Sequence, residues 1–356
     1  MKASTLFLFA CLAFVAQAQP PAPDFTVTSS DGQTHHLYAD YLNQGKTVVV
    51  KLFFTYCPPC NATAEQVEAF YQSWGGGEGM VEFIGLSTQN NDSNADVNQY
   101  KALHGQTFPG VGADGGSISA IQPYINGTYG LFLGTPTFIV IAPDGTVAYD
   151  PRGSNFDATL AELNDAIIAT GLAPYTDING NGTVKTKTGL GLPDVDVVIA
   201  AQTPLQSTSN ASGSFSFNLF APADAQFSIT ASSQDNDYLN GLSTADLLLI
   251  HAHVLGIMPL GTPEKRIAAD ADGNGIITTL DIISLRKLLL SIDTQLGNQD
   301  AWIFINTDYD FANQTNPLNE VYSGAATTIN YTAGQASPAR FTAIKIGDVN
   351  DSVVVN

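Results

Sequence analysis

The segment Cys57-Pro58-Pro59-Cys60 constrains this 356-residue chain most strongly. The sequence has only three cysteines, and the remaining one, Cys11, lies in an apolar N-terminal stretch. Two cysteines separated by two residues close too small a loop to stabilise a fold. A disulfide-stapled scaffold would also need more cysteines, spread along the chain. The pair therefore predicts chemistry rather than a structural cross-link.

The surroundings of the pair favour thiol chemistry. Residues 47–54 form a β-branched and aromatic run typical of a buried strand, and the segment after Cys60 has helical spacing. The N-terminus of a helix carries a partial positive charge, which stabilises the thiolate of Cys57. Cys60, one turn further, could attack a mixed disulfide. Half of a zinc site and inert buried thiols are the alternatives, and no second cysteine pair exists to complete a Cys₄ zinc site.

The region around the pair reads as one α/β unit over residues 23–172. Strands are expected over 81–86 and 138–142 as well as over 47–54, and a last helix over 156–170 ends at Gly171. Strands that alternate with helices predict a partly parallel sheet covered on both faces.

Three separated segments of this unit resemble exported thioredoxin-fold proteins, namely the thiol-disulfide oxidoreductases related to cytochrome c maturation. They are PDF at 23–25, FFTYCPPC at 53–60 and GTPTFIVIAPDGTV at 134–147. The resemblance implies a thioredoxin-like domain over residues 19–172. It also implies protein thiols or disulfides as substrates and an unidentified reducing or oxidising partner.

The same resemblance assigns roles to four residues. Cys57 is the expected attacking thiolate, and Cys60 the resolving thiol. In that family the proline of the downstream motif is cis and packs against the cysteine pair. Pro136 matches it, with Thr135 before it, and both are expected to orient the substrate.

Three positions near the pair depart from related families. Tyr56 stands where a Trp usually precedes the first cysteine, and Lys51 stands where thioredoxins carry a buried acid. A buried Lys51 could favour the thiolate or be neutral, and it could instead face solvent. Peroxiredoxins place Thr three residues before the reactive cysteine, where this chain has Phe54. A peroxiredoxin-like antioxidant is therefore the weaker alternative.

The N-terminus and the charge restrict location and partners. Lys2, the apolar residues 6–16 and the small-residue site at 16–18 predict a signal peptide over 1–18, hence export to the periplasm or the extracellular space. No later stretch approaches the length of a membrane span. The net charge of −20 argues against nucleic acid, because phosphates are bound by clustered Lys and Arg.

The composition changes at residue 173, where Asn, Gly, Ser and Thr become frequent. Short alternating strands over 195–200, 214–219 and 227–231 predict a small β-sandwich, which resembles the carboxypeptidase-regulatory-like type and is expected over 173–234. A β-rich C-terminal segment is expected over 294–356.

Residues 270–281 form a twelve-residue calcium-loop pattern followed by a helical run. Gly275 at position 6 permits the sharp turn, and Asp rather than Glu closes the loop. The expected ligands, in order, are Asp270, Asp272, Asn274, the carbonyl of Ile276, Thr278 and Asp281.

Residues 235–246 form an earlier and degenerate copy, because Leu239 replaces the oxygen ligand at position 5 and Gly241 is one place late. Its expected ligands are Asp235, Asp237, Ser243 and Asp246. Near the C-terminus, Asp348 and Asn350 look like the start of a third loop that does not close.

The two loops with their helices, over 235–293, resemble a type I dockerin repeat pair. The resemblance implies calcium as a structural cofactor and a cohesin-like receptor. Receptor contacts are expected at loop positions 10 and 11, which are Thr244, Ala245, Thr279 and Leu280.

The sequence therefore predicts a multidomain protein with an α/β thioredoxin-like domain, a small β-sandwich and an α-helical dockerin or EF-hand-like calcium module. The expected function is a secreted thiol-disulfide oxidoreductase with a calcium-dependent attachment module. The alternative is a secreted calcium-binding scaffold or adhesion protein with a vestigial redox domain. The sequence has no flavin or nicotinamide motif, so no organic cofactor is expected and electrons must come from another protein or a small thiol.

Overall fold

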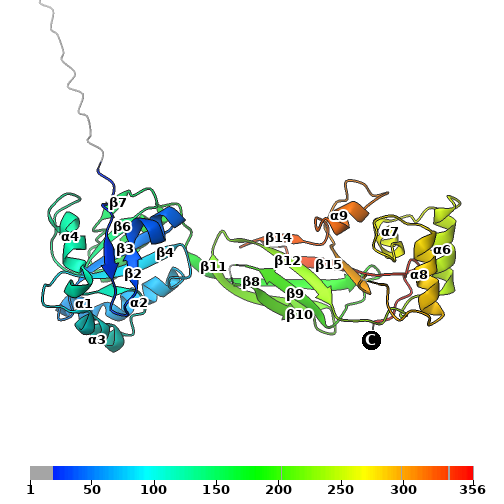
Figure 1. Ribbon diagram of the computed structural model, residues 1–356, viewed down its shortest axis with the longest axis horizontal. Coiled ribbons are helices and arrows are strands. Elements are labelled where there is room, and N and C mark those ends of the chain that lie inside the picture. The colour runs from blue at the N-terminus through cyan, green and yellow to red at the C-terminus, as the bar shows by residue number, and fades with distance from the viewer. Residues whose placement is uncertain (1–18, 202, 298, 336, 356) are drawn as a thin grey trace, which may run out of the picture. The chain divides into compact units, whose positions relative to one another are not determined.

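The computed structural model describes residues 19–201, 203–297, 299–335 and 337–355 (Figure 1). The predicted signal peptide, 1–18, lies outside the described residues. The chain divides into two compact units between Tyr175 and Thr176. This division falls close to the predicted boundary at 172, where the composition changes.

A five-stranded sheet forms the centre of the first unit, in the order β5-β4-β3-β6-β7. β3 runs parallel to β4, and β4 parallel to β5, whereas β6 is antiparallel to both β3 and β7. Every residue of β3, β4 and β6 is buried, which explains their nearly continuous apolar sequences. The strands are β3 (Thr47–Phe53), β4 (Val81–Ser87), β5 (Gly110–Val111), β6 (Thr137–Ile141) and β7 (Val147–Tyr149).

Helices cover both faces of this sheet, as predicted. Alternate residues of β3 separate the two cores: Val49 packs with α2 and α5, and Val48 packs with α4 and an N-terminal hairpin. The helices are α1 (Pro58–Ala62), α2 (Ala64–Ser73), α3 (Asn94–His104), α4 (Ser117–Ile125) and α5 (Phe156–Ile168), and the hairpin strands are β1 (Thr26–Thr28) and β2 (Thr34–His36).

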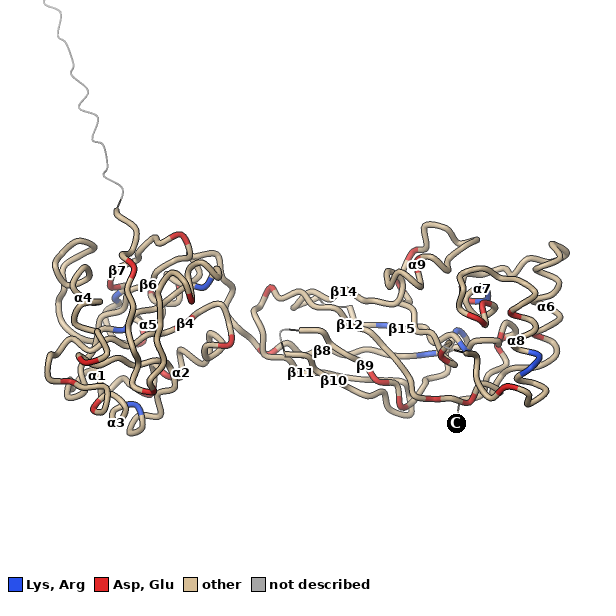
Figure 2. The backbone as a smooth tube through the Cα atoms, in the orientation of Figure 1, with Lys and Arg blue, Asp and Glu red and all other residues tan. Residues whose placement is uncertain are grey.

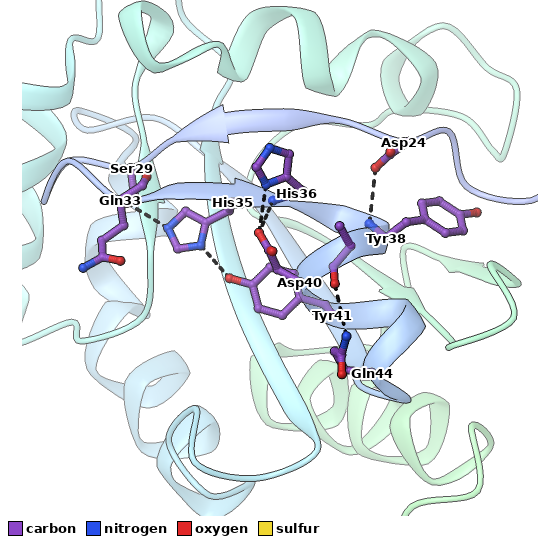
Figure 3. A network of polar contacts seen from close by, with 10 residues as sticks. Asp24, Ser29, Gln33, His35, His36, Tyr38, Asp40, Tyr41 and Gln44 are labelled. Atoms are coloured by element: carbon purple, nitrogen blue, oxygen red, sulfur yellow. Dashed lines mark hydrogen bonds and ion pairs between the residues drawn. The ribbon is translucent and has the colours of Figure 1, made fainter.

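A buried polar chain fastens the N-terminal hairpin to the turn that follows it (Figure 3). The ring of His35 on β2 lies between the Ser29 hydroxyl, 2.9 Å from Nε2, and the Tyr41 hydroxyl, 2.5 Å from Nδ1. Burial lowers the pKa of His35, which favours the neutral ring. The three side chains thus satisfy one another away from solvent.

The second unit contains two four-stranded sheets, ordered β10-β9-β12-β14 and β11-β8-β15-β13. Strands from the predicted C-terminal segment complete both sheets. β14 pairs with β12 in the first sheet, and β15 lies between β8 and β13 in the second. β15 is parallel to β8, although the two strands are far apart in the sequence. The strands are β8 (Tyr175–Thr186), β9 (Val195–Ala200), β10 (Leu205–Thr208), β11 (Ser214–Pro222), β12 (Gln226–Ser233), β13 (Trp302–Asn306), β14 (Ile329–Thr332) and β15 (Ala339–Lys345).

One hydrophobic core joins these sheets to the helices of the second unit. It contains Val197 and Phe341 from the strands together with Ile250 and Leu285 from the helices. The structure does not separate compact units at the predicted boundaries 234 and 293, because one cluster of buried residues runs across both. The helices are α6 (Thr244–Val254), α7 (Pro263–Ala269), α8 (Thr279–Leu289) and α9 (Leu318–Tyr322).

The acidic excess of the chain is spread over both units (Figure 2). Within the described residues, no helix has the length and apolarity needed to cross a membrane.

Candidate active site

Cys57 and Cys60 lie where β3 gives way to α1, and they form a disulfide. Cys57 is the N-cap residue, with extended backbone angles, and Pro58 is the first helical residue. Proline suits that position because its fixed φ is already helical and it lacks an N–H that would be left unpaired. The CPPC sequence therefore starts the helix and sets one cysteine a turn after the other.

Both cysteines are shielded from solvent, with exposed fractions of 1% for Cys57 and 0% for Cys60. The N–H of Cys60 donates to Sγ of Cys57 at 3.2 Å, which is the usual hydrogen bond to an N-cap side chain. In the reduced state this N–H and the helix N-terminus would stabilise a thiolate on Cys57.

Thr135 and Pro136 meet the cysteine pair from the other side. Their peptide bond is cis, and Oγ1 of Thr135 lies 3.2 Å from Sγ of Cys57, with its carbonyl oxygen at 3.7 Å. β6 begins at the next residue, so the central sheet holds this segment in place. The structure thus brings together the predicted residues Cys57, Cys60 and Thr135, with Pro136 adjoining them.

Polar side chains that sequence reasoning missed support the loop before Cys57. Asn61 donates its amide to the carbonyls of Thr55 and Cys57, at 3.1 and 2.7 Å, and its Oδ1 lies 2.8 Å from Nε2 of His104. Asp92, which is 2% exposed, accepts hydrogen bonds from both the N–H and the hydroxyl of Thr55. His104 and Asp92 are distant in sequence and match no motif, so no local pattern could have identified them.

Lys51 is fully buried, which excludes the solvent-facing alternative. Its Nζ lies among aromatic rings, 5.2 Å from the centre of Phe53 and 5.5 Å from that of Tyr100. Burial lowers the pKa of Lys51 to about 7. Nζ donates to the Tyr100 hydroxyl at 3.5 Å, and that hydroxyl donates to the carbonyl of Cys60 at 3.0 Å. Tyr100 therefore links the buried amine to the redox loop.

Comparison with protein families also indicates a redox domain in the first unit. Residues 17–167 match the family model described as Redoxin. The N-terminal unit is a thioredoxin-fold thiol-disulfide oxidoreductase domain. The match ends at residue 167 and leaves the second unit unassigned. Comparison with curated proteins yields no match.

Solved structures similar to the chain include a thiol:disulfide interchange protein of the thioredoxin family from Chlorobium tepidum, at 26% identity and a TM-score of 0.33. It covers 42% of this chain and 94% of its own. A secreted Mycobacterium tuberculosis disulfide oxidoreductase is 19% identical, with a TM-score of 0.31 and coverages of 41% and 95%. The thioredoxin domain of a Bacteroides vulgatus thiol-disulfide oxidoreductase is 19% identical, with a TM-score of 0.32 and coverages of 42% and 96%.

In the second unit, the 270–281 loop gathers three carboxylates. Oxygens of Asp270, Asp272 and Asp281 lie within 4.8 Å of one another, the one such group of acidic, His or Cys side chains among the described residues. Gly275 has φ +84°, which allows the sharp turn at position 6. Burial raises the pKa of Asp270 and of Asp281, and the charge of Asp272 raises both further. An oxygen-only set with this charge fits Ca²⁺.

The side chains of two other expected ligands accept hydrogen bonds from backbone N–H groups of the loop. Oδ1 of Asn274 accepts the N–H of Ile276 at 2.9 Å. Thr278 is the N-cap of α8, and its hydroxyl accepts the N–H of Leu280. Asp281, in the first turn of α8, accepts the N–H of Thr278 at 2.7 Å, and this hydrogen bond ties the end of the loop to the helix.

Of the four expected ligands of the 235–246 loop, Ser243 and Asp246 contact each other, whereas Asp235 and Asp237 have other partners. Asp235 accepts the indole N–H of Trp302 at 2.8 Å, and Asp237 accepts N–H groups of its own turn. Asp246 instead accepts N–H groups of residues 349 and 350, and Ser243 donates to Asp246. Asp246 thus contacts the segment near the C-terminus as well as Ser243, and calcium binding by the contiguous 235–246 loop stays a prediction.

Proposed function

We propose that the protein is an exported thiol-disulfide oxidoreductase that exchanges electrons between its Cys57–Cys60 pair and protein thiols or disulfides. The observation that carries the proposal is the position of this disulfide, at a helix N-terminus and against Thr135. The Redoxin match supports the exchange activity. Export rests on the signal-peptide pattern of residues 1–18.

The exchange follows from the geometry of the two cysteines. In the reductive direction, the Cys57 thiolate attacks a substrate disulfide, forms a mixed disulfide and releases one substrate thiolate. The Cys60 thiolate then attacks Sγ of Cys57, which releases the second substrate thiol and forms the Cys57–Cys60 disulfide. Two electrons pass to the substrate, and the reverse sequence oxidises a substrate dithiol. An external protein or small thiol resets the pair.

Thr135 is suited to position the substrate during this exchange. Its carbonyl and hydroxyl oxygens both lie close to Sγ of Cys57, and Thr135 and Pro136 are partly exposed to solvent. An extended substrate segment pairing with the backbone there would present its sulfur to Cys57.

The proposal gives the second unit a calcium-dependent attachment role. Its support is the carboxylate group at 270–281 and the exposure of all four expected receptor contacts, Thr244, Ala245, Thr279 and Leu280. Apolar side chains on the same helices are also exposed, with 70% for Leu248 and 49% for Ile283. A patch of this kind suits a protein receptor of the cohesin type.

These exposed side chains also favour the second candidate function, a calcium-binding scaffold with a vestigial redox domain. The two candidates differ in whether the first unit exchanges disulfides. A peroxiredoxin-like activity would instead show as peroxide consumption that depends on Cys57.

The test is disulfide exchange with a model protein disulfide in the presence of a small-thiol reductant. Cys57→Ser is expected to abolish exchange because it removes the attacking sulfur. Cys60→Ser is expected to accumulate the mixed disulfide, visible by mass, because the resolving sulfur is gone. Tyr56→Phe, which keeps the exposed ring beside the pair, is the matched control and should retain exchange. Undiminished exchange by Cys57→Ser would overturn the proposal.

A further inference from the structure

Residues 348–353 and the start of α6 together reproduce the loop that precedes α8. The first correspondence is between Asp348 and Asp270, which open the two arrangements. The N–H groups four and five residues after Asp348 donate to its two carboxylate oxygens at 2.9 and 2.8 Å. The N–H groups four and five residues after Asp270 donate to that carboxylate in the same order, at 3.2 and 2.9 Å.

The second correspondence is between the closing acids, Asp246 and Asp281, both of which are fully buried. Oδ1 of Asp246 accepts the N–H of Asn350 at 3.0 Å, and Oδ1 of Asp281 accepts the N–H of Asp272 at 3.2 Å. In both cases the donor lies two residues after the opening aspartate. Oδ2 of each closing acid also accepts the N–H three residues before it, at 2.9 and 2.7 Å.

The backbone follows the same course at the fourth position. Asp351 has φ +59°, and Gly273 at the matching place has φ +70°. Aspartate is one of the few residues with a side chain that adopts this left-handed conformation readily. Val353 then stands where the other loop has Gly275, and α6, not a following segment, supplies the closing helix.

This arrangement contains one buried oxygen without a partner. Oδ1 of Asn350 is shielded from solvent and has no hydrogen-bond partner in the described chain. Nδ2 of the same amide lies 3.5 Å from the hydroxyl of Ser243, which donates to Oδ2 of Asp246, so the amide faces the closing carboxylate. A buried acceptor left without a partner destabilises the folded protein, and a bound cation would satisfy it.

Neither carboxylate has a salt-bridge partner among the described residues, and Lys345 interacts with Asp348 only at longer range. Asp246 is 0% exposed and Asp348 is 6% exposed. Two buried carboxylates facing one another repel unless a cation lies between them.

We propose that Asp348, Asn350 and Asp246 bind a second calcium ion, in a site split between residues 348–352 and 243–246. Carboxylate and amide oxygens are the ligands that Ca²⁺ uses. The site joins segments about one hundred residues apart, and with calcium it would fasten residues 348–353 to α6. This proposal is independent of the redox function and of the ion proposed for the 270–281 loop.

The test counts calcium ions bound per chain by titration calorimetry of the purified protein with calcium chloride at millimolar concentration. We expect two ions for the wild-type protein and one for Asn350→Ala, which removes the orphan oxygen but keeps both carboxylates and their backbone hydrogen bonds. Asp348→Asn should also reduce the count by one. Asp237→Asn is the matched control, because it lies in the contiguous 235–246 pattern but outside the split site, and its count should stay unchanged.

Asp281→Asn separates this proposal from that of the 270–281 loop. Loss of one ion in Asn350→Ala and of a different one in Asp281→Asn supports two sites. If Asp281→Asn keeps the wild-type count while Asn350→Ala loses one ion, the split site stands and the other loop does not bind. An unchanged count in Asn350→Ala would overturn the split site. If Asp348→Asn does not fold, Asn350→Ala alone decides.

Discussion

At the scale of single residues, Lys51 is the most unusual feature of the redox domain. An amine surrounded by aromatic rings loses its hydration, and the hydroxyl of Tyr100 is the one hydrogen-bond partner that the described residues give it. Burial holds the pKa of Lys51 at about 7, against 10.5 in an unfolded chain. Below pH 7 the amine is charged in the folded and in the unfolded protein, so the folded protein is destabilised by the full cost of burying that charge.

This gives a pH-dependent prediction for Lys51→Met. Between pH 7 and 10.5 the unfolded chain binds more protons, so wild-type stability rises with pH through Lys51, by up to about 1.4 kcal/mol per unit. Lys51→Met removes this contribution and should stabilise the oxidised protein most at pH 6 and least near pH 10. Urea unfolding of both proteins across this range measures the difference. A difference that does not change with pH would show that Lys51 is not buried as a titrating amine.

At the scale of elements, the second unit depends on strands that are remote in sequence. β15 lies between β8 and β13 in one sheet, and β14 pairs with β12 in the other. The predicted sandwich of 173–234 therefore lacks β13, β14 and β15, which contribute Trp302, Tyr331 and Phe341 to the core.

We predict that a fragment covering 173–234 does not fold alone, whereas one covering 174–355 does. The longer fragment keeps the complete core that joins sheets and helices. Circular dichroism and a cooperative thermal transition distinguish the two fragments. A cooperative transition in the shorter fragment would contradict this account of the second unit.

Sequence patterns predicted the elements that depend on neighbouring residues, and they missed the contacts between segments that are remote in the sequence. The strands of the first unit, the helix after the cysteines and the 270–281 loop all follow from periodicity or fixed ligand spacing. The parallel pairing of β15 with β8, and the meeting of Asp246 with Asn350, depend on tertiary contacts that no local window contains. Lys51 lay in a predicted strand, but its burial depended on Tyr100 and Phe108, which approach it from other elements.

At the scale of the whole molecule, the division into two compact units predicts separable behaviour. Both proposed calcium sites lie in the second unit, and the cysteine pair lies in the first. A ligand that binds only the folded state stabilises the unit that contains its site.

Chelation of calcium is therefore expected to lower the melting temperature of one of two calorimetric transitions and to leave disulfide exchange unchanged. The transition that shifts should match that of a separate fragment covering 174–355. The melting temperature of a fragment covering 19–175 should not change when the chelator is added. Loss of exchange activity on chelation would contradict the independence of the two units.

Whether Cys57 and Cys60 form a working redox couple is best measured by their equilibrium in glutathione buffers, followed by mass after thiol alkylation. We predict one reversible two-electron transition, at a potential within the range of about −270 to −120 mV that separates reducing from oxidising members of such proteins. A pair that stays oxidised or reduced across all buffers, with no reversible transition, would show that the two cysteines are not a redox couple.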